Sequence, residues 1–131
     1  MAIPKTDAAA MVKQLKTMYP KASKSPEVKV LYKYLQPGES ILAMTTGINE
    51  GTKYLAAVVK TKIIFVAKKG RKQFDMPIKH VASVFVEPSG CLHFGQSNIC
   101  FNVQGKNERI LNAPRKEAEA FKAVVSSLAC E

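Results

Sequence analysis

The feature that most constrains the fold is the stretch 53–78, in which short apolar runs alternate with polar turns. Two of these runs, 54–59 and 63–67, are rich in β-branched and aromatic residues, and only the polar segment 60–62 separates them. A third run, 73–78, follows a basic turn that contains glycine. Short runs of this composition joined by tight turns predict a meander of antiparallel strands.

Further strand patterns flank this meander on both sides. Residues 41–48 precede it, and residues 81–86, 98–103 and 108–112 follow it, each bounded by Gly, Pro or Asn. About seven short strands at regular spacing are typical of a β-barrel or a β-sandwich.

The segment that begins at Pro114 predicts a C-terminal helix. Proline is favoured at the first position of a helix, and apolar residues then recur at intervals of three and four. These residues are Ala118, Phe121, Val124, Val125 and Leu128. Such a helix is suited to closing the open end of a barrel.

The N-terminal part of the chain predicts two short helices. The first covers 7–19, and the second begins at Ser25, which is a good N-cap, and ends before Pro37. We interpret the segment 21–24 between them as a polar, mobile link. An apolar helix face needs cover, so packing on the strands is favoured over a free docking arm. The sequence therefore divides into a helical extension, 1–37, and a β domain, 38–131.

Several segments resemble the short bacterial pleckstrin-homology-like (PH-like) domains. They are L-Q-P-G-E-S-I-L-A-M-T-T-G (35–47), V-V-K-T-K-I-I-F-V-A-K-K-G (58–70), F-D-M-P-I-K-H-V-A-S-V (74–84) and the final helix N-A-P-R-K-E-A-E-A-F-K-A-V-V. The resemblance implies a mainly β (α+β) fold: a seven-stranded antiparallel barrel of two nearly orthogonal sheets, with a C-terminal capping helix and an N-terminal helical extension.

The resemblance also implies a binding scaffold without catalytic activity. Eukaryotic relatives bind phosphoinositides through basic residues near the loop between the first two strands. Here that loop, 49–53, carries Lys53 beside Glu50 and lacks the repeated basic residues of the lipid-binding motif. The family's groove between strand five, at 84–86, and the outward side of the helix, at 117–125, is a second docking surface to consider.

Positive charge is the strongest functional signal from the residues themselves. The chain has 20 Lys and Arg against 10 Asp and Glu, a net charge of +10, which favours anionic partners. The excess is densest within 53–80, where Asp75 is the acidic residue. The candidate binding residues are Lys53, Lys60, Lys62, Lys68, Lys69, Arg71, Lys72 and Lys106. The alternative is a solvated turn whose lysines discourage aggregation between strand edges.

No pattern predicts catalysis, a metal or a cofactor. Cys100 lies inside a predicted strand, with neither His80 nor His93 placed near it in a nucleophile motif, so a buried small hydrophobic role is favoured. The three cysteines are an odd number without a C-x-x-C pair, which predicts neither a disulfide framework nor a zinc site. We therefore expect no catalytic residues, no metal site and no cofactor.

We expect a cytoplasmic, non-enzymatic binding module, because the apolar runs are too short to span a bilayer and the N-terminus lacks a signal-peptide pattern. The leading hypothesis is a protein-interaction adaptor or inhibitor that occupies a macromolecular partner with an acidic surface. The alternative is direct binding of an anionic ligand, either an acidic lipid surface or nucleic acid, through the basic end of the hairpins. Homo-oligomerisation stays open.

Overall fold

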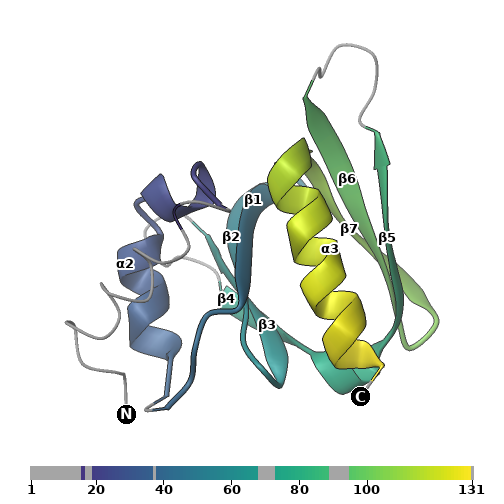
Figure 1. The fold of residues 1–131 in the computed structure, drawn as a ribbon, viewed down its shortest axis with the longest axis horizontal. Helices are drawn as coiled ribbons and strands as arrows, with labels where there is room; N and C mark the ends of the chain where they lie inside the picture. The colour runs from purple at the N-terminus through teal and green to yellow at the C-terminus, as the bar shows by residue number, and fades with distance from the viewer. Residues whose placement is uncertain (1–15, 17–18, 37, 68–72, 89–94, 131) are drawn as a thin grey trace.

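The computed structural model describes residues 16, 19–36, 38–67, 73–88 and 95–130. Strands and a long C-terminal helix make up most of this part of the chain, and short helical segments precede them (Figure 1). The strands are β1 (Ala43–Asn49), β2 (Thr52–Val58), β3 (Lys62–Ala67), β4 (Gln73–Pro77), β5 (Val81–Pro88), β6 (Gln96–Val103) and β7 (Lys106–Pro114). The helical elements are η1 (Ala22–Lys24), α2 (Val28–Leu31), η2 (Tyr32–Tyr34), η4 (Ile78–His80) and α3 (Arg115–Ala129).

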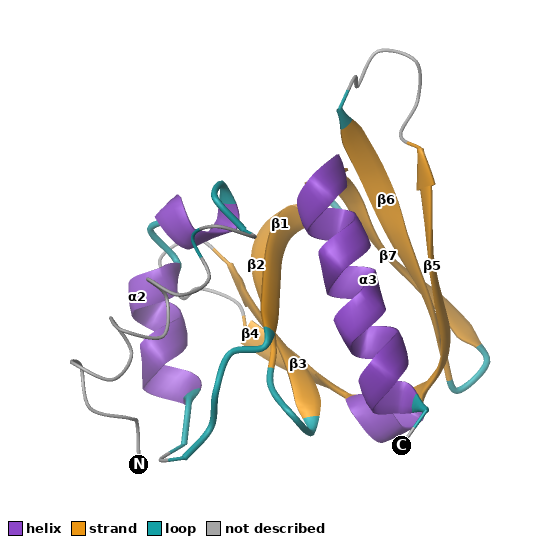
Figure 2. Cartoon of the chain, in the orientation of Figure 1, coloured by secondary structure: helices purple, strands orange, loops and turns teal. Residues whose placement is uncertain are grey.

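The strands form a 7-stranded antiparallel sheet in the order β4-β3-β2-β1-β7-β6-β5. Strands β1 to β4 make one half and β5 to β7 the other, and α3 lies between the two halves (Figure 2). The halves meet where Ile48 of β1 pairs with Leu111 of β7. This arrangement confirms the mainly β fold of seven antiparallel strands with a C-terminal helix.

A close approach at Gly47 explains how β1 can cross β7. A Cβ atom at this position would lie 2.1 Å from Cγ2 of Ile110 and 2.9 Å from the carbonyl oxygen of Leu111. Real Cβ atoms do not come this close to their neighbours, so any residue with a side chain would push the two strands apart. Glycine at this position therefore fixes the seam between the two halves.

The core forms between the strands and the helix, as the apolar pattern predicts. Ala118, Phe121 and Val125 of α3 are fully buried, and the ring of Phe121 meets that of Phe101 edge to face at 6.4 Å. The structure thus confirms the predicted apolar face of the helix, which begins at Arg115, directly after Pro114.

The described part of the N-terminal extension, within residues 19–36, packs on the barrel, as expected from its apolar residues. Tyr19, Ala22, Leu31 and Leu35 are fully buried and belong to the same core as the strands. Element η1 contacts β1 and α2 contacts β3. The predicted second helix is present as two short pieces, α2 and η2. The predicted boundary at residue 37 stays a prediction, and most of the predicted first helix lies outside the described residues.

The prediction of a mobile link at 21–24 is wrong. Residues Ala22–Lys24 form the 3-10 helix η1, and both Ala22 and Ser23 are buried. Small and polar side chains such as these favour a mobile segment in the absence of other contacts. The segment is ordered because the backbone N–H groups of Lys21 and Ala22 donate hydrogen bonds to the carboxylate of Glu117, near the other end of the chain.

Candidate functional site

The candidate basic residues do not form one group. Lys60 and Lys62 lie at the turn between β2 and β3, whereas Lys53 lies at the opposite end of β2 beside the turn that follows β1. Strands rise about 3.3 Å per residue, so roughly 20 Å separates Lys53 from Lys60. Lys106 begins β7, directly after the turn at Gln104 and Gly105. The remaining predicted residues, Lys68, Lys69, Arg71 and Lys72, lie outside the described residues.

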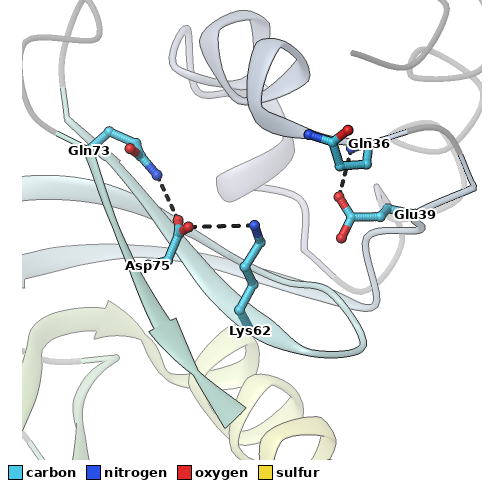
Figure 3. Close-up of polar contacts among 5 residues, drawn as sticks. All are labelled: Gln36, Glu39, Lys62, Gln73 and Asp75. Atoms are coloured by element: carbon cyan, nitrogen blue, oxygen red, sulfur yellow. Dashed lines mark hydrogen bonds and ion pairs between the residues drawn. The ribbon is translucent and has the colours of Figure 1, made fainter. Parts of the chain in front are cut away.

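Among the candidates that the structure describes, Lys62 has an acidic partner. Its Nζ lies 3.5 Å from Oδ2 of Asp75, and Nε2 of Gln73 donates a hydrogen bond of 2.6 Å to the other oxygen of the same carboxylate (Figure 3). Both charged side chains are partly exposed, and such pairs add little stability. The pairing nevertheless lowers the net positive charge at this edge of the sheet.

The other described candidates are exposed cations. Lys53, Lys60 and Lys106 all reach solvent, and within the described part of the chain none of them forms an ion pair with a carboxylate. They stand at or beside hairpin turns. Their ammonium groups are therefore open to a partner that approaches either end of the strands.

A hollow of about 360 Å³ lies between the β1–β2 turn, β4 and the β6–β7 hairpin. Glu50, Asp75 and Glu108 line it, together with apolar and amide side chains, and its described lining includes no lysine or arginine. Asn49 holds this corner together, because its Nδ2 donates to Oε2 of Glu108 at 3.3 Å and to the carbonyl oxygen of Arg109 at 2.9 Å. Three carboxylates make this hollow unfavourable for a phosphate group.

A buried carboxylate holds the N-terminal extension to the barrel. The side chain of Glu117, in the first turn of α3, is 1% exposed. Its Oε2 accepts a hydrogen bond of 2.7 Å from the backbone N–H of Lys21, and the N–H of Ala22 lies 3.3 Å from both carboxylate oxygens. Burial raises the pKa of Glu117, while these N–H groups act in the opposite direction. Tyr19 is fully buried nearby, and burial together with the charge of Glu117 raises the pKa of its hydroxyl.

Sequence reasoning missed this role of Glu117, although a signal was present. Glu117 lies four residues before Phe121 and eight before Val125, so it continues the apolar stripe of the helix. A carboxylate on the buried face of an amphipathic helix needs hydrogen-bond donors, because burying an unpaired charge is very unfavourable. The pattern could therefore have indicated a partner, but not which one.

Cys100 does not have the surroundings of a reactive thiol. It is buried on β6 opposite Phe85 of β5 and Arg109 of β7. Burial and the nearby carboxylate of Glu87 raise the pKa of the Cys100 thiol, which is the opposite of what a nucleophile requires. Within the described ranges, no three His, Cys, Asp or Glu side chains are grouped as metal ligands.

An exposed aromatic side chain marks the edge of the second half of the barrel. Phe85 of β5 is 54% exposed, while its neighbours Val84 and Val86 pack partly against the core. Strand β5 ends the sheet order, and α3 packs against it. Because side chains alternate along a strand, Phe85 points to the face of β5 opposite Val84 and Val86 and does not line the predicted docking groove between β5 and the helix.

Comparison with known proteins identifies one family. The family described as "Bacterial PH domain" matches residues 35–127. No curated protein matches the sequence. No described helix is long and apolar enough to cross a membrane.

Several solved structures are similar to this one. The PH domain of USP37 superposes with a TM-score of 0.57 at 16% identity, covering 68% of this chain and 97% of that one. The C-terminal domain of an unknown protein from Leishmania infantum superposes with a TM-score of 0.55 at 14% identity, covering 70% of this chain and 85% of that one. The complex of human RhoA with a DH/PH fragment of PDZRHOGEF gives 0.54 at 5% identity, covering 96% of this chain and 40% of that one. At these identities the likeness shows a shared fold.

Proposed function

Because this chain belongs to the bacterial PH domain family, we propose that it is a non-enzymatic adaptor or inhibitor that occupies an acidic surface of a protein partner. PH domains generally act by binding proteins or lipids. The observation that carries the proposal is that Lys60 and Lys106 are exposed and have no acidic partner among the described residues, in a chain whose net charge is +10. Lys60 lies at the β2–β3 turn, whereas Lys106 lies at the opposite end of the strands, beside the β1–β2 turn. The proposed contact residues therefore cover both ends, and they also include Lys68, Lys69, Arg71 and Lys72 from the sequence prediction.

Electrostatic attraction suits such a surface. The lysines stand at hairpin turns of an ordered sheet, so little backbone order has to be gained when a partner binds. A net charge of this size steers an acidic partner toward the molecule and speeds association, with an effect that weakens as salt rises. We therefore expect partner binding that depends on salt and on these side chains.

Two further observations favour a protein partner over a bare anion. The hollow at the barrel end is lined by carboxylates, which repel phosphate. Phe85 presents an exposed aromatic side chain on an edge strand, and aromatic residues are enriched in protein–protein interfaces. Direct binding of an acidic lipid surface or nucleic acid is the alternative outcome of the test below.

A pull-down from native lysate with a charge-reversed control tests the proposal. Wild-type protein is compared with K60E/K106E and with K68E/K69E/R71E/K72E, in lysate halves with and without nuclease. The matched control for the double variant is K29E/K33E, which makes the same charge change at exposed lysines of α2 and η2. Circular dichroism and thermal unfolding check that each variant is folded.

We expect wild type and the control K29E/K33E to retain one protein in stoichiometric amount in both lysate halves. K60E/K106E and K68E/K69E/R71E/K72E should lose it. Full retention of that protein by both K60E/K106E and K68E/K69E/R71E/K72E would refute the proposed surface. Recovery that disappears with nuclease treatment, or sedimentation with acidic vesicles in place of a protein, would establish the alternative.

A further inference from the structure

The three strands of the second half of the barrel have a face that points away from the helix. Helix α3 packs against β5, β6 and β7, and Ile99 and Ile110 are buried on that inner side. Side chains alternate along a strand and paired residues share a face, so the residues beside them point outward. The pairing places Phe85, Cys100 and Arg109 in one row across the three strands. We call this surface the outer face.

The outer face has an exposed aromatic side chain bordered by polar residues. Phe85 is 54% exposed, more than any other large apolar side chain of the described residues. The rows beside it contain Ser83, Asn102 and Asn107 on one side and Glu87 and Asn98 on the other. An aromatic side chain with a polar border is typical of a protein–protein contact.

These three rows are electrically neutral, although the chain carries a net charge of +10. Glu87 is their acidic residue and Arg109 their basic one, and both lie near the Cys100 thiol. Within the described residues neither of them forms an ion pair. Lysine supplies most of the positive charge of the chain and is absent from these rows. Two copies of the chain can therefore meet on this face without placing lysines against each other.

We propose that the outer face binds the same face of a second copy of this chain. In a symmetric dimer the contact patch must be complementary to itself under a two-fold rotation. Phe85 and Arg109 lie one strand to either side of Cys100, at about 4.8 Å per strand. A two-fold axis that runs along β6 therefore places Phe85 of each copy over Arg109 of the other.

The contacts across this axis match in chemistry. A guanidinium over an aromatic ring forms a cation–π contact, and arginine and aromatic residues carry much of the binding energy of protein interfaces. Glu87 lies two residues from Phe85 on the same face of β5, so its carboxylate is placed to reach the same guanidinium of the other copy. Each charge that has no ion pair within the described monomer thus gains a partner of opposite sign, and the symmetry forms each contact twice.

The size of the outer face sets the strength of the dimer. Three strands about 4.8 Å apart, at about 3.3 Å per residue along the length of β5, cover roughly 400 Å². A standard interface buries about 800 Å² of each partner. We therefore expect a weak dimer with a Kd of about 0.1 mM.

Sedimentation velocity of the full-length protein from about 10 µM to about 1 mM tests the proposal. Wild type should pass from monomer to dimer over this range. F85S should weaken the dimer at least about tenfold, because it removes the aromatic ring from both symmetric contacts. The matched control is L42S, because Leu42 is also an exposed apolar side chain, at 39%, and precedes β1, outside the outer face. L42S should dimerise as wild type does.

A charge exchange tests the geometry of the contact. E87R and R109E should each weaken the dimer, because like charges would then face each other across the axis. The double variant E87R/R109E restores opposite charges and should dimerise more tightly than either single variant. Amide shifts of wild type that change with protein concentration at Phe85, Cys100 and Arg109 provide a readout that needs no variant.

Salt separates this dimer from the proposed binding of an acidic partner. Two copies that each carry +10 repel one another, so added salt should strengthen the dimer, whereas it weakens binding of an acidic partner. K60E/K106E should still dimerise, so failure of the proposed lysine surface is distinguishable from failure of this interface. The proposal is overturned if wild type stays monomeric at about 1 mM, if F85S and L42S have equal effects, or if E87R/R109E is no tighter than the single variants.

Discussion

Replacing Glu117 by alanine should destabilise the whole domain and not only the start of α3. The carboxylate accepts hydrogen bonds from the backbone N–H groups of Lys21 and Ala22, which are 96 and 95 residues away in sequence. Alanine would leave both donors without this acceptor. The N-terminal extension would then lose its polar attachment to the helix and keep only its apolar contacts.

The expected loss in the free energy of unfolding is about 3 kcal/mol. A hydrogen bond to a charged acceptor contributes about 1.5–3 kcal/mol, and an unsatisfied buried donor costs about 1–3 kcal/mol. Two bonds are lost, but relief of the buried charge and entry of water beside the exposed Lys21 offset part of the loss. In a domain of this size, about 3 kcal/mol lowers the melting temperature by roughly 10 °C.

Urea unfolding of E117A and E117Q measures this effect, with hydrogen exchange as the local readout. The glutamine carbonyl oxygen can still accept a bond from the backbone, so E117Q should stay within about 1 kcal/mol of wild type. In E117A, amide protection at Lys21 and Ala22 should fall further than protection in β6. If E117A loses less than about 0.5 kcal/mol, these bonds do not hold the extension and the reasoning is wrong.

Three further outcomes are expected. Burial raises the pKa of Glu117, so the folded protein binds a proton at this carboxylate more tightly than the unfolded protein does. The free energy of unfolding of wild type should therefore fall relative to that of E117Q as the pH rises from the ordinary glutamate pKa through the raised value. Parallel pH profiles of the two proteins would contradict this expectation. G47A should lower the free energy of unfolding, measured in urea, by about 3 kcal/mol, because its Cβ would lie 2.1 Å from Ile110. G51A has a positive φ but open space around it, so it should lower that free energy by about 1 kcal/mol. Equal losses in the two variants would argue against the close crossing of β1 and β7. Thiol labelling followed by mass spectrometry should modify the exposed Cys130 in the native state and the buried Cys100 only after unfolding; rapid native labelling of Cys100 would point to a reactive thiol.

Much of the fold could be predicted from the sequence, because short-range patterns determine it. Alternating apolar residues joined by turn residues define β2 and β3, and the spacing of Phe121 and Val125 defines the buried face of α3. These patterns act between residues that are close in the chain. The number of strands and the capping helix could therefore be predicted from patterns among residues that are close in the sequence.

The candidate site was harder to predict, because it depends on contacts between distant residues. A basic stretch of sequence does not show that Lys53 and Lys60 lie at opposite ends of one strand, which follows from the pairing register. The order of residues 21–24 depends on Glu117, and composition alone suggested a mobile link. The exposure of Phe85 likewise depends on which strand ends the sheet.

The attachment of the extension to Glu117 also bears on the order in which the protein folds during synthesis. Lys21 is made long before its acceptor, which lies 96 residues further along the chain. At about 5–20 residues per second, the ribosome needs roughly 5–20 s to reach that acceptor. During this interval the apolar side chains of Tyr19 and Leu31 have no completed barrel to cover them. The extension can therefore reach its final position only after α3 has emerged, and the nascent chain is most exposed to aggregation and to chaperones before that step.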